Sequence, residues 1–249
     1  MKQRIFIFSL LAVMAFATPP KKKITIWMCG DSTMSIKETK AYPETGWGMP
    51  FVNFWDSTVT VVNKAKNGRS TQSFIDEGLW KSVTDNLKED DYVFIQFAHN
   101  DEVPSKKTYT TPEQFRNNLI KYITETRQKK AIPVLLTPVA RRKFDSTGRI
   151  VDTHEAYAQI VRDVAKANNV YLVDMSEKSM ALLQNIGPAA SAYLFNHLVA
   201  GEHPNYPEGK IDDTHFSELG ARKMAELALA EIRNLKLELA DRIVMRSTK

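Results

Sequence analysis

Short apolar runs alternate with longer amphipathic stretches along most of the chain. The runs are Ile24–Met28, Val59–Asn63, Tyr92–Phe97, Ile132–Thr137 and Val170–Asp174. Because they are almost continuously apolar, they predict strands that are buried on both faces of a sheet. Pro133 lies near the start of its run, where a strand tolerates it.

The stretches between these runs carry helix start signals. Thr111 is a capping residue that is followed by proline and, three positions on, by a glutamine that completes a capping box. Asp152 is placed to cap a second helix that stops near Asn168, and Ser217 is placed to cap the last helix. The β-α-β-α order predicts an α/β protein, a three-layer α/β/α sandwich with a central parallel sheet of about five strands.

The N-terminus differs in kind from the rest of the chain. Lys2 and Arg4 precede a short apolar run that ends in small residues, which predicts a secretory signal peptide over 1–17 with cleavage near Ala17. We therefore expect a secreted or periplasmic protein, and an uncleaved N-terminal anchor is the alternative. No linker or composition shift interrupts the remainder, so we expect a single domain over 22–240.

Composition and charge exclude some partners. The 249 residues carry a formal charge of +5, which falls to +3 without Lys2 and Arg4. So mild an excess does not indicate nucleic-acid binding, although it suits an anionic substrate. Cys29 is the one cysteine, so the chain has no internal disulfide, and its apolar setting predicts an inert core residue. We expect a monomer with no membrane contact beyond the signal peptide.

Polar residues gather where the predicted strands end. These segments are Gly30-Asp31-Ser32-Thr33 after the first run, the loop with Gly68 after the second, Ala98-His99-Asn100-Asp101 after the third and Arg141-Arg142 after the fourth. A fifth segment, Asp212-Asp213-Thr214-His215, precedes the last helix. In an open parallel sheet, functional loops lie beyond the carboxyl ends of the strands. We therefore expect the four loops after the strands to face one crevice, with the fifth segment at the same edge of the sheet.

Ser32 is the candidate nucleophile of this crevice. A serine hydroxyl needs a base to take its proton, and a histidine base needs an acceptor that fixes its tautomer. Asp212 and His215 are three residues apart, so the carboxylate can fold back onto the imidazole in a turn that enters a helix. Asp213 competes with Asp212, but it stands two residues before the histidine and its side chain would point away. The N–H groups of Ser32 and Gly68 and the amide of Asn100 are candidate oxyanion donors.

Each segment alone has an ordinary explanation. Gly-Asp-Ser is most often only a turn, and the two aspartates with His215 could ligate a metal. No second histidine lies at ligand spacing, so we expect no metal and no cofactor. His197 and His203 have no assignable partner, and His154 is expected at the surface.

The combination of segments resembles the SGNH (GDSL-type) hydrolase family. The family's blocks occur in order from Ile24 to the last helix, as Gly30-Asp31-Ser32, Gly68, Asn100-Asp101 and Asp212-x-x-His215. The chain is most similar to the rhamnogalacturonan acetylesterase branch, through residues 30–34, 67–70, 99–101 and 212–221. The resemblance implies the flavodoxin-like fold of that family.

The resemblance also implies roles for individual residues. Ser32 would be the nucleophile, His215 the base and Asp212 its orienting acid. Ser32, Gly68 and Asn100 would form the oxyanion hole, and Asp31 would hold the turn. Two positions depart from the family. Ala98 stands where glycine is usual, which we expect to do little harm because alanine is small, and Thr33 stands where leucine is frequent.

The implied reaction is ester hydrolysis through an acyl-enzyme. Secretion and the branch resemblance point to O-acetyl groups on a plant polysaccharide, with pectic rhamnogalacturonan first. Arg141 and Arg142 suit uronate carboxylates, and His99 is a further candidate for substrate binding; a solvated basic loop is the alternative. Two rival functions are an SGNH esterase acting on acetylated xylan, sialic acid or lipid, and a non-catalytic glycan-binding module.

Overall fold

A computed structural model describes residues 21–244 of the chain. The strands are β1 (Ile24–Gly30), β2 (Val59–Asn63), β3 (Tyr92–Gln96), β4 (Ile132–Leu136) and β5 (Tyr171–Val173). The helices are α1 (Gly48–Phe51), α2 (Thr71–Asp76), α3 (Leu79–Thr84), α4 (Pro112–Gln128), α5 (Glu155–Ala167), α6 (Met175–Ala190) and α7 (Glu218–Asn234). The expected signal peptide, 1–17, lies outside the described residues.

The five strands form one parallel sheet in the order β2-β1-β3-β4-β5. The prediction of about five parallel strands is confirmed. The central strands β1, β3 and β4 are buried on both faces, as their apolar runs predicted. The same expectation is wrong for β2 and β5, which are half-exposed because an edge strand has a neighbour on one side only.

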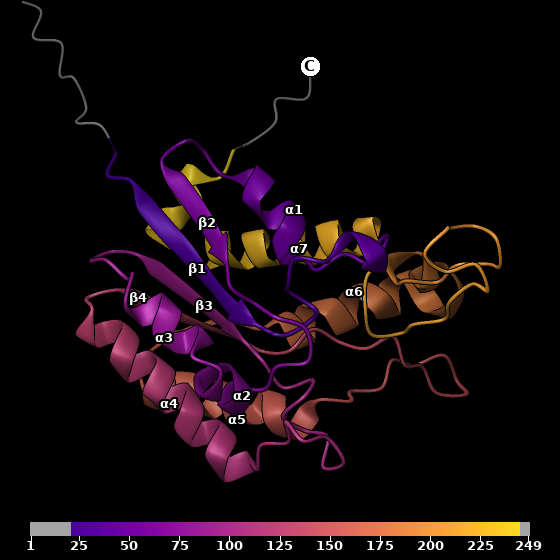
Figure 1. Cartoon of the computed structure of the whole chain (residues 1–249), viewed down its shortest axis with the longest axis horizontal. Coiled ribbons are helices and arrows are strands. Elements are labelled where there is room, and N and C mark those ends of the chain that lie inside the picture. Colours follow the sequence, from indigo (N-terminus) through magenta and orange to yellow (C-terminus); the bar gives the residue numbers. More distant parts are fainter. Residues whose placement is uncertain (1–20, 245–249) are drawn as a thin grey trace, which may run out of the picture.

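Helices cover both faces of the sheet. Helices α1, α6 and α7 pack on one face, and α2, α3, α4 and α5 pack on the other (Figure 1). Successive side chains of β1 pack alternately into the cores on the two faces of the sheet, because side chains alternate along a strand. Met28 joins the first core and Cys29 the second. Burial raises the pKa of the Cys29 thiol, in keeping with an inert core residue.

The helix starts follow the predicted signals at two of three places. Thr111 caps α4 with a complete capping box, and Ser217 accepts a hydrogen bond from the N–H of Gly220 at the start of α7. The prediction that Asp152 caps α5 is wrong. The N-cap is His154, and the Asp152 carboxylate instead accepts from the His154 N–H, 2.8 Å away, in the turn before the helix.

The strand order reverses between β1 and β3, since the chain passes from β1 outward to β2 and returns to the other side of β1. Ligands of open α/β sheets bind beyond the strand ends at such a switch point. The turn after β1 carries Ser32 and the turn after β3 carries Asn100. The last residue of β1 is Gly30, where a Cβ would lie 2.7 Å from the Gln96 carbonyl oxygen, so this position favours glycine.

An antiparallel ribbon, residues 195–216, extends from the same edge of the sheet. Its bridges join Phe195 to Phe216, Leu198 to Lys210 and His203 to Tyr206. The ribbon docks on the segment 39–42, where Asn205 Nδ2 donates to the Thr39 carbonyl (2.7 Å) and Tyr206 Oη to the Ala41 carbonyl (2.9 Å). Segments distant in sequence therefore form one wall beside the switch point. Across residues 21–244, the helices are too short or too polar to span a bilayer.

Candidate active site

The turn after β1 is fixed by Asp31. Its Oδ1 accepts from the Thr33 N–H (2.9 Å) and the Thr33 hydroxyl (2.8 Å), a bond that a leucine at this position could not make. The Asp31 carbonyl accepts from the N–H groups of Met34 and Ser35. Burial raises the pKa of the Asp31 carboxyl, against the hydrogen bonds from Thr33. These bonds hold the intervening Ser32 at the strand end.

Ser32, His215 and Asp212 form one hydrogen-bonded chain. The Ser32 Oγ lies 2.9 Å from His215 Nε2, and His215 Nδ1 lies 2.9 Å from Asp212 Oδ2. The other oxygen of Asp212 accepts from the N–H groups of Thr214 and His215, each at 2.9 Å. Burial opposes ionisation of Asp212, but its bonds to His215 outweigh it and hold the pKa of that carboxyl well below its usual value.

The tautomer of His215 follows from this chain. An ionised carboxylate only accepts, so Nδ1 carries the proton and Nε2 presents its lone pair to the serine hydroxyl. This is the arrangement in which an imidazole removes a serine proton. Asp213, the competing acid, lies elsewhere. It accepts from Arg142 Nη1 and from His197 Nε2, both at 2.8 Å.

The three expected oxyanion donors come from three strand ends. Gly68 has φ +77°, a conformation that favours glycine. Within residues 21–244, the N–H groups of Ser32 and Gly68 donate to no other residue. Asn100 Nδ2 donates to the Arg69 carbonyl (3.0 Å) while Lys106 donates to Asn100 Oδ1 (2.8 Å). The amide keeps a second N–H, and its role in an oxyanion hole stays a prediction.

Ala98 has a backbone conformation that is unusual for a residue with a side chain. It is fully buried with φ +132°, in the region that favours glycine. Its Cβ imposes backbone strain that glycine would not, and the expectation that alanine does little harm at this position stays a prediction. Next to Asn100, the Asp101 carboxylate binds the first residue of α2, accepting from the Thr71 N–H (2.8 Å) and hydroxyl (2.6 Å).

A partly buried cluster adjoins the turn that carries Asn100. Glu102 accepts from Arg141 Nη1 (2.8 Å) and from His154 Nδ1 (2.9 Å). His99 and His154 stack edge to face, 4.2 Å between ring centres, and His99 Nε2 donates to the Val139 carbonyl. The expectation that His154 lies at the surface is wrong, since the Glu102 carboxylate and the His99 ring enclose it and leave it 2% exposed.

His99 is buried rather than open to the crevice, and burial lowers its pKa well below the usual value. Glu102, Arg141 and His154 line an open surface pocket of about 550 Å³. Arg142 is held by internal partners, since it donates to Asp213 (2.8 Å) and to the Pro188 carbonyl (2.5 Å). The structure thus brings Arg141 to this surface pocket but gives both arginines carboxylate partners within the chain.

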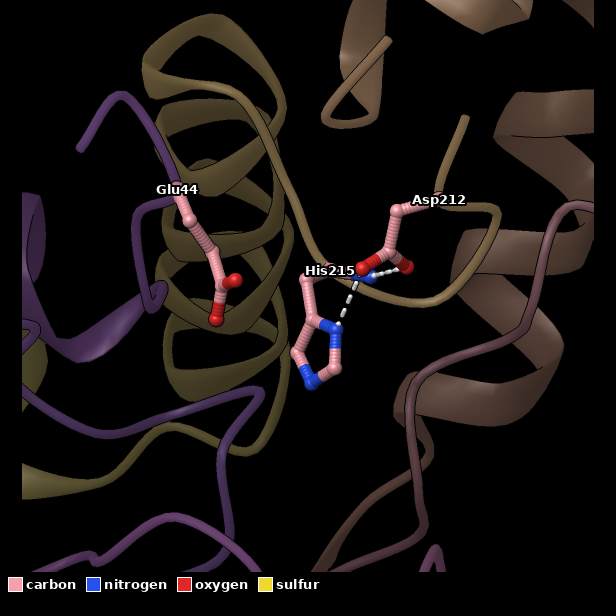
Figure 2. A group of neighbouring side chains, drawn as sticks. All are labelled: Glu44, Asp212 and His215. Carbon is pink, nitrogen blue, oxygen red and sulfur yellow. Dashed lines mark hydrogen bonds and ion pairs between the residues drawn. The ribbon is translucent and has the colours of Figure 1, made fainter. Parts of the chain in front are cut away.

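Three charged residues near His215 were not anticipated. Glu44 approaches the imidazole from the segment after β1, and in Figure 2 the ring lies between Glu44 and Asp212. Lys37 pairs with Glu44 (2.8 Å), and Lys210 lies 3.3 Å from both Glu44 and Asp212. Oxygens of the two carboxylates and a ring nitrogen lie within 4.8 Å of one another, as metal ligands would. The two ammonium groups already balance both carboxylates, so this donor set does not require a metal ion.

An open parallel sheet whose carboxyl edge joins serine, histidine and aspartate in this way has the architecture of a serine hydrolase. The profile of the GDSL-like lipase/acylhydrolase family matches residues 28–223. The chain belongs to the GDSL-like lipase/acylhydrolase family, and it is a carboxylic ester hydrolase.

Two curated relatives match nearly the whole chain. Rhamnogalacturonan acetylesterase RhgT of Bacillus subtilis is 40% identical over 230 residues, which cover 92% of this chain and 98% of that protein. Probable rhamnogalacturonan acetylesterase YesY of the same organism is 32% identical, over 88% of this chain and 97% of that protein.

Solved structures support the fold. The protein YXIM of Bacillus subtilis superposes with a TM-score of 0.76 at 25% identity; the match covers 88% of this chain and 59% of that longer chain. Axe2, an acetylxylan esterase from Geobacillus stearothermophilus, superposes with a TM-score of 0.62 at 18% identity, over 90% of this chain and 98% of that one.

Proposed function

We propose that the protein is a secreted acetylesterase that removes O-acetyl groups from pectic rhamnogalacturonan. One observation carries the proposal. The hydrogen-bonded chain of Ser32, His215 and Asp212 occurs in a protein that is 40% identical, over 92% of its length, to a rhamnogalacturonan acetylesterase. The serine supplies a nucleophile for an acetyl carbonyl, and the relatives indicate the polysaccharide that bears it.

In the proposed mechanism, His215 Nε2 takes the proton of Ser32 as its Oγ attacks the acetyl carbonyl. The oxyanion binds the N–H groups of Ser32 and Gly68 and the amide of Asn100. The sugar hydroxyl leaves with the proton from His215. Water, deprotonated by the same histidine, then hydrolyses the acetyl-serine. Asp212 keeps the imidazole in the required tautomer and stabilises the imidazolium.

The test of the nucleophile is kinetic. Ser32→Ala should lower kcat on 4-nitrophenyl acetate by at least about 10³-fold, because no other group replaces the hydroxyl. A fluorophosphonate probe should label the wild type and not the variant. Near-normal hydrolysis by Ser32→Ala would overturn the assignment.

The polysaccharide is tested by acetate release from a substrate panel. Acetylated rhamnogalacturonan should release acetate faster than acetylated xylan, a sialic acid ester or a lipid ester. A preference for acetylated xylan would support the proposed acetylesterase activity but contradict rhamnogalacturonan as its substrate.

Arg141 and Arg142 remain proposed uronate contacts. Arg141→Ala and Arg142→Ala should each raise KM on acetylated pectic fragments and leave KM on neutral 4-nitrophenyl acetate unchanged. Equal effects on both substrates would assign the two guanidinium groups to their ion pairs with Glu102 and Asp213 alone.

Secretion is part of the proposal and rests on the basic, apolar and small-residue pattern of 1–17. Protein recovered outside the cytoplasm of a bacterial host should have a new N-terminus just after Ala17. An intact N-terminus retained in the membrane fraction would favour an anchor.

A further inference from the structure

Four charged side chains form a connected cluster behind His215. Lys37 Nζ lies 2.8 Å from Glu44 Oε1, and Lys210 Nζ lies 3.3 Å from Glu44 Oε2 and 3.3 Å from Asp212 Oδ2. We refer to Lys37, Glu44, Lys210 and Asp212 as the charge cluster. Two ammonium groups and two carboxylates leave it with no net charge. Replacing any one member by a neutral residue therefore changes the net charge beside the imidazole by one unit.

Lys37 is the buried end of the charge cluster. Its side chain is 0% exposed, and the ammonium donates to the Ser32 carbonyl (2.5 Å) and to Asn67 Oδ1 (3.0 Å). Burial lowers the pKa of Lys37, against the attraction of Glu44. A buried ammonium needs such partners to remain charged. Lys37 therefore ties the nucleophile turn to the loop that holds Gly68.

Glu44 is the member outside the hydrogen-bonded chain whose carboxylate lies beside the imidazole, with oxygens of Glu44 and Asp212 and a ring nitrogen of His215 all within 4.8 Å of one another (Figure 2). Burial opposes its ionisation, but His215, Lys37 and Lys210 outweigh it and hold the pKa of the Glu44 carboxyl below its usual value. Lys210 also stays charged, because Glu44 and Asp212 outweigh its burial and raise its pKa.

Two further titratable groups act on His215 from other elements. Asp31, in the turn after β1, and His99, in the turn after β3, both interact electrostatically with it. Neither belongs to the charge cluster, so substitutions within the cluster leave both in place.

We propose that Glu44 and Lys210 are positioning residues that set the basicity of His215 in opposite directions. Glu44 favours the imidazolium that forms when Ser32 loses its proton, and Lys210 opposes it. Their opposite charges therefore act on the imidazolium with opposite signs. The inference rests on the proposed function, in which His215 is the base.

The expected shift follows from the distances. A unit charge within 4.8 Å of a ring nitrogen, as Glu44 is, moves the midpoint of the imidazole titration by at least roughly 0.6 pH units at an effective dielectric constant of about 80 and roughly 2.5 at about 20; the shift from Lys210 has the opposite sign. Glu44→Gln leaves the cluster at +1, so the imidazole loses its proton at lower pH. Lys210→Met leaves it at −1, so the imidazole loses its proton at higher pH.

The experiment is the pH dependence of kcat/KM between about pH 4 and 9 on 4-nitrophenyl acetate. The acidic limb should move down by at least half a unit in Glu44→Gln and up in Lys210→Met, with kcat lowered in Glu44→Gln. Glu44→Asp retains the charge and should restore the wild-type limb. Superimposed profiles, or shifts in the same direction, would overturn the proposal, because a merely structural role gives no opposite signs.

Matched controls come from the ion pair of Lys121 and Glu125 on α4, across the sheet from α7. Lys121→Met and Glu125→Gln should leave the profile unchanged. Glu44→Gln removes the carboxylate partner of buried Lys37, so this variant can fail to fold. In that case Lys210→Met, at a partly exposed position, is the test, and an unshifted pH profile in Lys210→Met overturns the proposal.

The result separates this inference from the proposed function. A wild type that hydrolyses no ester would overturn the proposed function. The ring resonances of His215, titrated by NMR in the same variants, would still report the two shifts. An active wild type with an inactive Ser32→Ala variant and unshifted titrations would overturn the charge cluster only.

Discussion

Asp101 makes the stability of the protein depend on pH in an unusual direction. Its Oδ1 is bonded to Thr71, while Oδ2 has no hydrogen-bond partner within residues 21–244. Burial raises the pKa of the Asp101 carboxyl to about 7, against the hydrogen bonds from Thr71. The unfolded chain ionises this group near pH 3.8. Between the two values the folded state holds a proton that the unfolded chain has lost, so stability falls as pH rises.

The magnitude follows from the two pKa values. With 3.8 in the unfolded chain and about 7 in the folded protein, the loss of unfolding free energy between pH 5 and pH 8 is about 2.6 kcal/mol. The loss is complete just above pH 7, where both states are ionised. Most paired carboxylates contribute stability as pH rises, which is the opposite direction.

The assay is urea unfolding of the wild type and Asp101→Asn at pH 5 and pH 8. Comparing the two proteins cancels the other titrating groups, so the wild type should lose about 2.6 kcal/mol relative to the variant. Asp85→Asn, a substitution at the end of α3, serves as control and should show no such change. A difference between wild type and Asp101→Asn that stays constant to within about 0.5 kcal/mol would refute the reasoning, because Asp101 would then be ionised throughout.

Three further substitutions test other parts of the structure. Ala98→Gly should raise the unfolding free energy by about 1 kcal/mol in urea titrations, because relief of the φ +132° strain exceeds the added chain entropy; a loss of stability would contradict the strain. Asn100→Ala should lower kcat on 4-nitrophenyl acetate by about 10²- to 10³-fold with little change in KM, as for a lost oxyanion donor; a KM effect alone would make it a binding residue. Gly220→Ala should lower stability by more than about 2 kcal/mol, since its Cβ would lie 1.7 Å from the Leu194 carbonyl oxygen; a wild-type melting temperature would show that α7 can shift.

Much of the fold could be predicted from the sequence because the central strands are short apolar runs bounded by polar turns. Val59–Asn63 matches β2 at both ends, and β1 continues two residues past its predicted end to Gly30. Helices α2 and α3 could not be predicted, because six residues carry too little periodicity. Strand order could not be read from the runs either, since it depends on where each crossover returns.

The candidate site also contains residues that the sequence could predict and residues that it could not. Ser32 and the Asp212-x-x-His215 segment could be predicted, because their geometry is local or fixed by the strand edge. Glu44 carries no such signal, since tertiary packing alone brings it to the imidazole. His154 could not be assigned from sequence for the same reason: its partner, Glu102, lies 52 residues earlier in the chain.

The hydrogen bond between Ser32 and His215 joins residues that are 183 positions apart. At about 5–20 residues per second, roughly 10–40 s of synthesis separate the two. Throughout that interval the growing chain presents a serine with no base beside it. Under the proposed mechanism, the chain therefore gains hydrolytic capacity only once His215 has been synthesised, and a truncated chain that ends before His215 lacks the proposed base.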